Sequence, residues 1–257
     1  MKVANRCDFY SEGFFGYGLK GDFTYWSFWH FLPIIILLVL IFLIYKYKDK
    51  IRKSKHEENI RFIAAFIMIL MELGYYWRLL YAGSGSVEYT TLLTKLPIQV
   101  CDWVCIIASF MLMKKSKFLY KICYFVALTL GLLPLITPAV IMTTGPSYFR
   151  YYQYWIIHIL PIASVFYMMF VHKFEVKYKD ILKPCAFLLI MAFIAIYFNS
   201  VIPKANFMFL AANTPGDSLA NITPSNVWIR LLVYCVIGVA LLSLAYVPIL
   251  INKRKKH

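Results

Sequence analysis

The chain has 257 residues, of which 61% are hydrophobic and only 15% are charged. About a quarter of the residues in a soluble domain are charged, so this composition excludes a soluble globular protein and predicts an integral membrane protein. The formal net charge of +15 does not indicate nucleic-acid binding, because no basic nucleic-acid-binding module is present and the basic residues gather in short loops between apolar segments.

The first 25 residues lack the continuous apolar core of a signal peptide, and we expect an extracytoplasmic segment over 1–25. Seven apolar segments follow, each near the roughly 20 residues that cross about 30 Å of hydrocarbon, although the third is short. They predict an all-α bundle of seven transmembrane helices, a single domain over 26–251 with a basic tail at 252–257. The segments run at about 26–45, 60–81, 97–113, 118–140, 150–171, 181–201 and 228–251.

The basic residues predict the orientation of the chain. Four stretches hold 19 of the 27 basic residues, and a seven-helix topology puts all four on one side of the membrane. The positive-inside rule makes that side cytoplasmic, with the N-terminus outside and the C-terminus inside. The preference for Lys over Arg suggests a bacterial cell, so we expect a multi-pass protein of its plasma membrane. The basic stretches are 46–61, 114–121, 172–183 and 253–256.

Two features are expected at the outer membrane surface. His30 opens the first apolar segment and is interpreted as an interfacial residue. The outer loop at 202–227 is long, with polar turns on both sides of the apolar patch NFMFLAA. Loops of this length are often functional, and this one is expected to fold back as a lid or to lie in the interface.

Polar residues inside the apolar segments concentrate in the outer half of the predicted membrane. At about 1.5 Å per residue, Cys101 and Asp102 lie about 6–8 Å deep and His158 about 12 Å deep. Arg78 and Glu72 are six residues apart on one helix, too far round to pair well, so each is expected to bond another helix. A charge in hydrocarbon is costly unless it is paired or faces water. The asymmetry predicts an outward-facing polar cavity rather than a continuous ion path.

Each of these residues also has a purely structural interpretation. Asp102 can pair with Arg78, and His158 can be satisfied by a backbone carbonyl. Cys101 can be ordinary packing, since cysteine often behaves as a small hydrophobe. Cys105 follows Cys101 by one turn, but no second Cys/His pair accompanies them, so no metal site and no cofactor is expected.

The chemical alternative is a nucleophilic pair. A thiol in apolar surroundings is inert unless a base or a cation activates it. His158 on a neighbouring helix can take the proton of Cys101, and Asp102 can orient the histidine or balance its charge. At this depth the ester bonds of phospholipids are the reactive groups at hand.

Several motifs resemble those of the YwaF/TMEM164 family of integral membrane proteins. They are LPIQVCDW with its LP-x3-C pattern, the proline-ended fourth segment, and the FR-x7-H spacing from Phe149 and Arg150 to His158. The resemblance implies a bundle of six or seven helices, and acyl transfer into ether phospholipids that uses a cysteine and a histidine, here Cys101 and His158. The chain departs from the family in having Gln99, where the family often has His.

Two functional hypotheses follow. The first is a membrane enzyme that modifies lipid acyl chains, with Cys101 as nucleophile, His158 as base, membrane phospholipids as partners and a lipid acyl donor. Arg78 and Arg150 would hold a lipid phosphate, as arginine forks do well. The second is a binding or transport protein without catalysis, in which Asp102, Glu72 and Arg78 bind a polar solute or headgroup. A third reading, a subunit of a larger complex, stays open, as does the oligomeric state.

Overall fold

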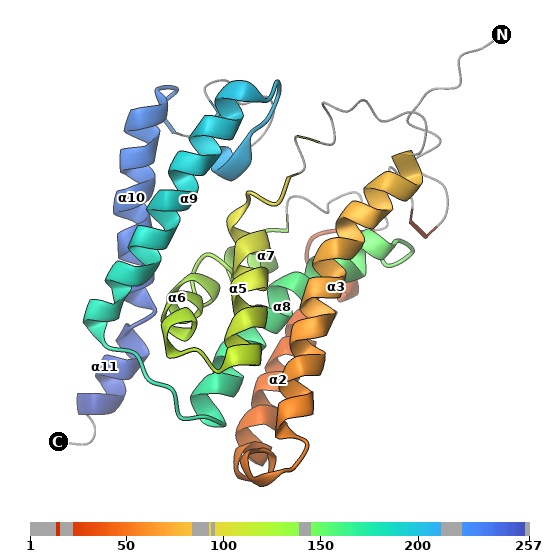
Figure 1. Ribbon diagram of the computed structural model, residues 1–257, viewed down its shortest axis with the longest axis vertical. Helices are drawn as coiled ribbons and strands as arrows, with labels where there is room; N and C mark the ends of the chain where they lie inside the picture. The colour runs from red at the N-terminus through yellow and green to blue at the C-terminus, as the bar shows by residue number, and fades with distance from the viewer. Residues whose placement is uncertain are drawn as a thin grey trace.

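The computed structural model describes residues 14–15, 23–83, 93, 96–138, 145–211 and 223–254, and this part of the chain is helical without strands (Figure 1). The predicted outer segment 1–25 and the tail 252–257 lie largely outside it. The elements in chain order are α2 (Phe28–Lys53), α3 (Glu57–Gly83), α5 (Val100–Lys114), α6 (Lys117–Ala127), α7 (Leu133–Ile136), α8 (Phe149–Phe170), η2 (Tyr178–Ile181), α9 (Leu182–Val201), η3 (Phe207–Phe209), α10 (Val227–Leu244) and α11 (Val247–Arg254).

Five helical stretches within the described residues are long and apolar enough to cross a membrane. The all-helical, multi-pass membrane architecture predicted from composition is therefore confirmed. All seven predicted segments contain helix, but two of them are shorter than a membrane crossing needs. The five stretches are Phe28–Lys53, Glu57–Trp77, Phe149–Phe170, Tyr178–Val201 and Val227–Ile251.

The third and fourth predicted segments are the short ones. Helix α5 has 15 residues, and the continuous helix expected over 118–140 is interrupted after α6, which has 11. At the interruption the Gly131 N–H donates to the carbonyl of Val126. A Cβ on Gly131 would lie 2.6 Å from the carbonyl oxygen of Ala127, so only glycine allows this tight turn. Pro134 then stands in the first turn of the four-residue α7, where its missing N–H costs no hydrogen bond.

Helix α8 is the centre of the larger hydrophobic core, to which α2, α3, α5 and α6 also contribute. Of the 18-residue window that makes α8 a candidate span, 72% is buried, against 17% for α2. Helix α8 packs against α2, α3, α5 and α6, while α2 leaves a broad apolar face uncovered. Such a face is what contact with lipid requires.

A second core lies between α9, the start of α5 and the segment 202–211, which we call the re-entrant segment. Its buried members include Ile98 just before α5, Ala195 on α9, and Phe207 within η3. Leu231 and Tyr234 of α10 pack against it from the other side. The re-entrant segment therefore packs against the helices of the protein, while residues 212–222 of the outer loop lie outside the described part.

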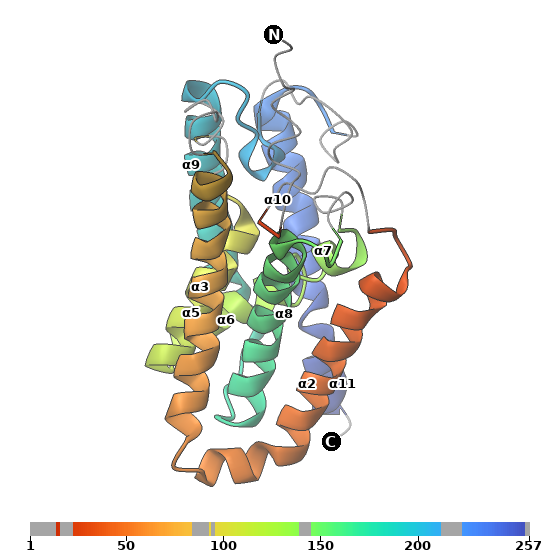
Figure 2. The ribbon, with the colours of Figure 1, turned by 90° about the vertical axis from the view of Figure 1, so that its right-hand side faces the viewer.

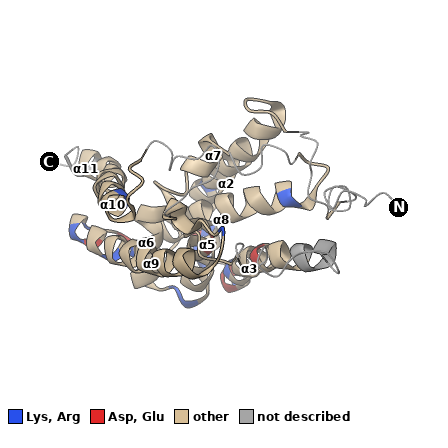
Figure 3. Ribbon diagram, turned by 90° about the horizontal axis from the view of Figure 1, so that it is seen from above, with Lys and Arg blue, Asp and Glu red and all other residues tan. Residues whose placement is uncertain are grey.

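The basic loops meet at one end of the bundle, which we call the basic end. Lys115 lies 3.6 Å from Glu57, and Lys121 lies 2.9 Å from Asp180. Arg52 donates to the backbone carbonyls of Phe170 and Val171 at the end of α8. Figures 1 and 2 show the α2–α3 turn, the end of α8 and α11 toward this same end. Viewed along the long axis, most of the ribbon carries neither acidic nor basic residues (Figure 3).

Candidate functional site

The first turn of α5 holds both Cys101 and Asp102. Gln99 has an extended backbone and caps the helix, and Asp102 is the third helical residue. The Gln99 N–H donates to Asp102 Oδ2 at 3.2 Å, which is half of a capping box. Asp102 Oδ1 accepts a hydrogen bond from the Cys101 thiol at 3.5 Å. Asp102 thus holds the helix start and the thiol together, a role that the sequence interpretation did not assign to it.

Glu72 approaches this turn from α3. Its side chain is buried, and Oε2 has no hydrogen-bond partner among the described residues. Glu72 and Asp102 repel each other electrostatically, and the guanidinium of Arg150 on α8 attracts both. The structure thereby brings two acidic groups and one arginine together where α3, α5 and α8 pack against one another.

Arg150 lies between two tyrosine rings. Its guanidinium carbon is 4.6 Å from the ring centroid of Tyr75 and 5.6 Å from that of Tyr154, distances at which the ring faces attract a cation. The same guanidinium donates to the side-chain oxygen of Gln153. The sequence predicted Arg150 as a site residue but not the two tyrosines. Their only signal in the sequence is their spacing of about one helical turn, Tyr75 from Glu72 and Tyr154 from His158.

His158 is buried on α8 with a defined tautomer. Nδ1 lies 2.7 Å from the backbone carbonyl of Tyr154, and a carbonyl can only accept, so Nδ1 carries the proton and Nε2 is left as the basic nitrogen. Among the described residues no hydrogen bond joins His158 to Cys101, whose thiol donates to Asp102 instead. The prediction that a backbone carbonyl satisfies His158 is confirmed for one nitrogen.

Two other predicted residues have different outcomes. The side chain of Arg78 lies outside the described residues. His30, interpreted as interfacial, is fully buried. It accepts from the Trp26 N–H at 3.1 Å and donates through Nε2 to the Leu135 carbonyl at 2.9 Å. The interfacial interpretation of His30 is therefore wrong, because its ring is enclosed by the protein: Nε2 ties α2 to α7, and Nδ1 holds the turn that precedes α2.

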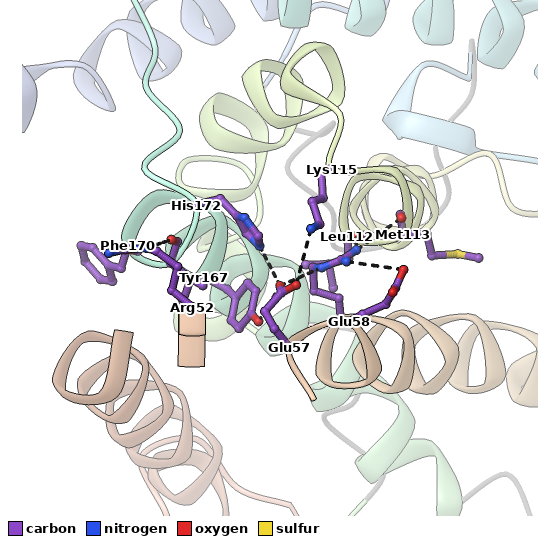
Figure 4. A network of polar contacts seen from close by, with 11 residues as sticks. Arg52, Glu57, Glu58, Leu112, Met113, Lys115, Tyr167, Phe170 and His172 are labelled. Atoms are coloured by element: carbon purple, nitrogen blue, oxygen red, sulfur yellow. Dashed lines mark hydrogen bonds and ion pairs between the residues drawn. The ribbon is translucent and has the colours of Figure 1, made fainter. Parts of the chain in front are cut away.

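A second polar cluster, which we call the Glu57 network, occupies the basic end (Figure 4). Glu57 Oε1 accepts from Arg61 Nε at 2.8 Å, from the Tyr167 hydroxyl at 3.0 Å and from His172 Nε2 at 2.7 Å. Arg61 is 2% exposed and also donates to the carbonyl of Leu112. The sequence predicted only the membrane topology of this region. It did not predict the network, because the partners of Glu57 come from three separate parts of the chain.

Burial lowers the pKa of His172 below its usual value of 6.5, and the neighbouring cations Lys115 and Arg61 add to that effect. The hydrogen bond to Glu57 works in the opposite direction. A neutral His172 donates one proton to Glu57, so the network needs no charge on the imidazole. Each polar side chain of the Glu57 network has a hydrogen-bond or ion-pair partner. Such an arrangement stabilises the fold and is not typical of a reactive site.

Within the described residues, no group of three or more His, Cys, Asp or Glu side chains could hold a metal ion. Cys105, which follows Cys101 by one turn, is buried and its thiol lies 3.6 Å from the backbone carbonyl of Met68. That contact makes Cys105 a packing residue between α5 and α3.

The model of the TMEM164 family matches residues 25–246. No curated protein and no solved structure matches the chain.

Proposed function

This chain belongs to the TMEM164 family, as its cysteine and histidine motifs predicted, and we propose that it is a membrane enzyme that transfers acyl chains between phospholipids. Cys101 would be the nucleophile and His158 the general base. Membrane phospholipids would serve as acyl donor and acceptor. The proposal joins what the family resemblance implies to the position of Cys101 in the fold.

The orientation is part of the proposal. We assign the basic end to the cytoplasm, the N-terminal segment 1–25 to the outside and the tail 252–257 to the inside of a bacterial plasma membrane. The positive-inside rule supports this choice, because three basic loops and α11 gather at one end. The domain 26–251 would then cross the membrane seven times, with α5 and the interrupted α6–α7 as short crossings enclosed by longer helices.

The observation that carries the proposal is the place of Cys101 in the first turn of α5. It is half-buried, near Glu72, Tyr154 and Arg150. The start of a helix and the Arg150 guanidinium favour an anion there, whereas burial and the carboxyl groups of Asp102 and Glu72 oppose it, so the thiol needs a base to take its proton. Cys101 has such a base within hydrogen-bond distance in Asp102, whereas the thiol of Cys105 one turn later is buried against the backbone carbonyl of Met68.

The proposed reaction has two halves. In the first, the Cys101 thiol gives its proton to a base, its sulfur attacks the ester carbonyl of a donor phospholipid, and an acyl–sulfur bond replaces the ester C–O bond. The proton goes to the departing lysophospholipid oxygen. In the second half, the hydroxyl of an acceptor lysophospholipid gives its proton to the same base and attacks the thioester. The acyl chain moves to the acceptor, and the proton returns to the sulfur.

Two groups are suited to hold that proton. Asp102 Oδ1 already accepts from the thiol at 3.5 Å. His158 Nε2 is the free basic nitrogen of a ring whose other nitrogen is bound to Tyr154. The nucleophilic pair of Cys101 and His158 requires the two to approach once the lipid is bound, which is common because catalytic hydrogen bonds often tighten only in the complex.

The test compares lipid profiles of cells that express single variants. Cys101→Ser and His158→Ala are each expected to abolish the change in phospholipid acyl composition that the wild-type protein produces. Cys105→Ala is the matched control, since it removes a thiol one turn away on the same helix and should leave the profile of the wild type. If both site variants still produce the acyl composition that the wild-type protein produces, the proposal is wrong.

A second candidate is supported by the unpaired Oε2 of Glu72. Two acidic groups and an arginine between tyrosine rings form a site in which a polar solute or a lipid headgroup can bind without any covalent step. In that case Cys101 is packing and Asp102 is a binding group. In this case Cys101→Ala would keep the function and Asp102→Asn would lose it. If the protein is an enzyme, by contrast, Cys101→Ala would lose the function.

A further inference from the structure

The re-entrant segment 202–211 is held in place from two helices. On α9, the Asn199 amide accepts from the Phe207 N–H at 2.7 Å and donates to the Phe207 carbonyl at 3.0 Å. On α10, Arg230 is 2% exposed and its Nη1 donates to the carbonyls of Phe209 and Ala211 at 3.2 and 2.6 Å. The segment therefore has a specified conformation rather than the freedom of an ordinary loop.

That conformation is strained at its centre. Met208 and Phe209 have φ values of 53° and 55°, in the left-handed region that costs a side chain of this size about 1–2 kcal/mol per residue. Phe207 just before them is 1% exposed in the second core. Strained backbone persists where the surroundings over-determine it, and it clusters at functional sites. The left-handed turn has a visible consequence, since it aims the Met208 N–H at the start of α5.

The Met208 N–H donates to Gln99 Oε1 at 2.9 Å. The Gln99 N–H in turn donates to Asp102 Oδ2 at 3.2 Å, and Asp102 Oδ1 accepts from the Cys101 thiol at 3.5 Å. A chain of three hydrogen bonds thus runs from the re-entrant segment to the thiol. It passes through Gln99, the position at which this sequence departs from the histidine often found in the family.

We propose that Gln99 is a positioning residue, which docks the re-entrant segment on α5 and thereby sets the geometry and accessibility of the Cys101–Asp102 pair. Cys101 and the re-entrant segment lie on different sides of α5, since Cys101 faces Glu72 and Tyr154, whereas Trp103 packs in the second core. Gln99 therefore does not contact the thiol and acts on it through Asp102 in the first turn of α5. Its role in catalysis rests on the proposed function, but its effect on Cys101 does not.

The experiment measures two properties of the purified full chain in detergent. Hydrogen–deuterium exchange of a peptide covering 202–211 reports docking of the segment. The rate at which N-ethylmaleimide alkylates Cys101, resolved by peptide mass spectrometry, reports accessibility of the thiol. Gln99→Met keeps the length of the side chain and removes the acceptor. Loss of one hydrogen bond shifts a local opening equilibrium about fivefold, and both rates are expected to rise by about that factor.

Three further variants make the result specific. Gln99→Glu keeps an oxygen at the same reach and is expected to restore slow exchange of the segment. Asn199→Ala releases the segment from the α9 side, and should speed Cys101 alkylation although Gln99 is intact. Asn226→Ala removes two hydrogen bonds to the N–H groups of Trp228 and Ile229 at the start of α10, and is expected to leave Cys101 at the wild-type rate.

The outcomes separate the alternatives. Faster exchange with unchanged alkylation in Gln99→Met would mean that docking does not reach Cys101, and the inference would be overturned. Unchanged exchange would show that Gln99 does not hold the segment, with the same conclusion. Should Gln99→Met fail to fold, Asn199→Ala decides alone by the same two rates. A wild-type lipid profile in Cys101→Ser together with altered alkylation in Gln99→Met would remove the proposed enzyme and keep this inference.

Discussion

Two glutamates on helix α3 have opposite surroundings. Glu57 at the basic end is paired with Arg61, Lys115, Tyr167 and His172. Glu72 lies 15 residues further along the same helix, about 22 Å away, and its Oε2 is buried without a partner among the described residues. Both side chains are less than a tenth exposed, so burial alone does not distinguish them.

The difference separates structure from function. A buried carboxylate costs several kcal/mol unless hydrogen bonds and opposite charges offset the loss of water. The Glu57 network supplies both, and it fastens α3 to α5 and α8 at the end where the loops meet. Glu72 has less: Arg150 attracts it electrostatically, but its Oε2 has no hydrogen bond in the described part of the chain. A polar group that does not help stability is retained for another reason, which makes the Glu72, Asp102 and Arg150 junction the place to look for a ligand.

The largest effect is expected from Arg61→Met. It breaks a buried pair and leaves both Glu57 and the Leu112 carbonyl short of a donor, which should lower the free energy of unfolding by about 3–5 kcal/mol. Thermal unfolding in detergent measures the loss. Lys115→Met removes a half-exposed partner of the same carboxylate and should cost less than about 1 kcal/mol. Equal losses in the two variants would show that burial does not control the strength of this network.

A smaller loss is expected from Gly74→Val, beside the other glutamate. A Cβ at Gly74 would lie 2.8 Å from the ring of Phe149 on α8. Overpacking of this kind costs about 1–3 kcal/mol, and it should push α8 with its Arg150 away from Glu72 on α3. Gly238→Val is the control on α10, since a Cβ there meets nothing within 4 Å. Indistinguishable unfolding midpoints for the two variants would contradict the close α3–α8 contact.

Glu72→Gln is expected to change stability by less than about 1 kcal/mol, because Oε2 makes no hydrogen bond among the described residues that the amide would lose. The amide keeps the shape of the side chain and removes a negative charge that Asp102 repels and Arg150 attracts. The same variant should lose the acyl-profile change used to test Cys101. A destabilisation as large as that of Arg61→Met would mean that Glu72 is structural after all, and the contrast between the two glutamates would fall.

The smallest effect concerns pH. The pKa of His172 is lowered below 6.5 in the folded protein by burial, so below that pH the unfolded chain binds a proton that the folded chain does not. The contribution of His172 to the free energy of unfolding is therefore fully present at higher pH. It decreases as the pH falls from about 6.5 toward the pKa of His172 in the folded protein. His172→Gln keeps a donor for Glu57 and should flatten this decline by a few tenths of a kcal/mol. Unfolding midpoints between pH 5 and pH 8 would show whether the slope persists.

Local patterns predicted the elements well. In a membrane every backbone polar group must be bonded within the chain, so an apolar run of about 20 residues is helical wherever it packs. The fourth segment was the exception, because the turn at Gly131 depends on how closely the backbone approaches Ala127. The candidate residues Cys101, Asp102, Glu72 and Arg150 were also identified from sequence, since a polar group in an apolar run stands out.

Partners of those groups were harder to predict. His30 was assigned to the membrane surface, and only the fold shows that it is enclosed by α7 and aromatic rings. The Glu57 network joins residues 110 and 115 positions apart in the chain. Gln99 was noticed only as a departure from the family pattern, and its bond to Met208 spans 109 positions.

By itself the sequence determined that this protein is helical, lies in a membrane, gathers its basic residues in a few loops and carries polar residues inside its apolar segments. Hydropathy and charge are properties of single residues and their close neighbours, which is why they can be read along the chain. The tertiary structure decided that α8 is central and α2 peripheral, although both are long and apolar enough to span a membrane. Lipid is as apolar as a protein core, so hydropathy cannot tell a buried helix from an exposed one. Packing alone determines which polar atoms find hydrogen-bond partners and which, like Oε2 of Glu72 within the described residues, do not.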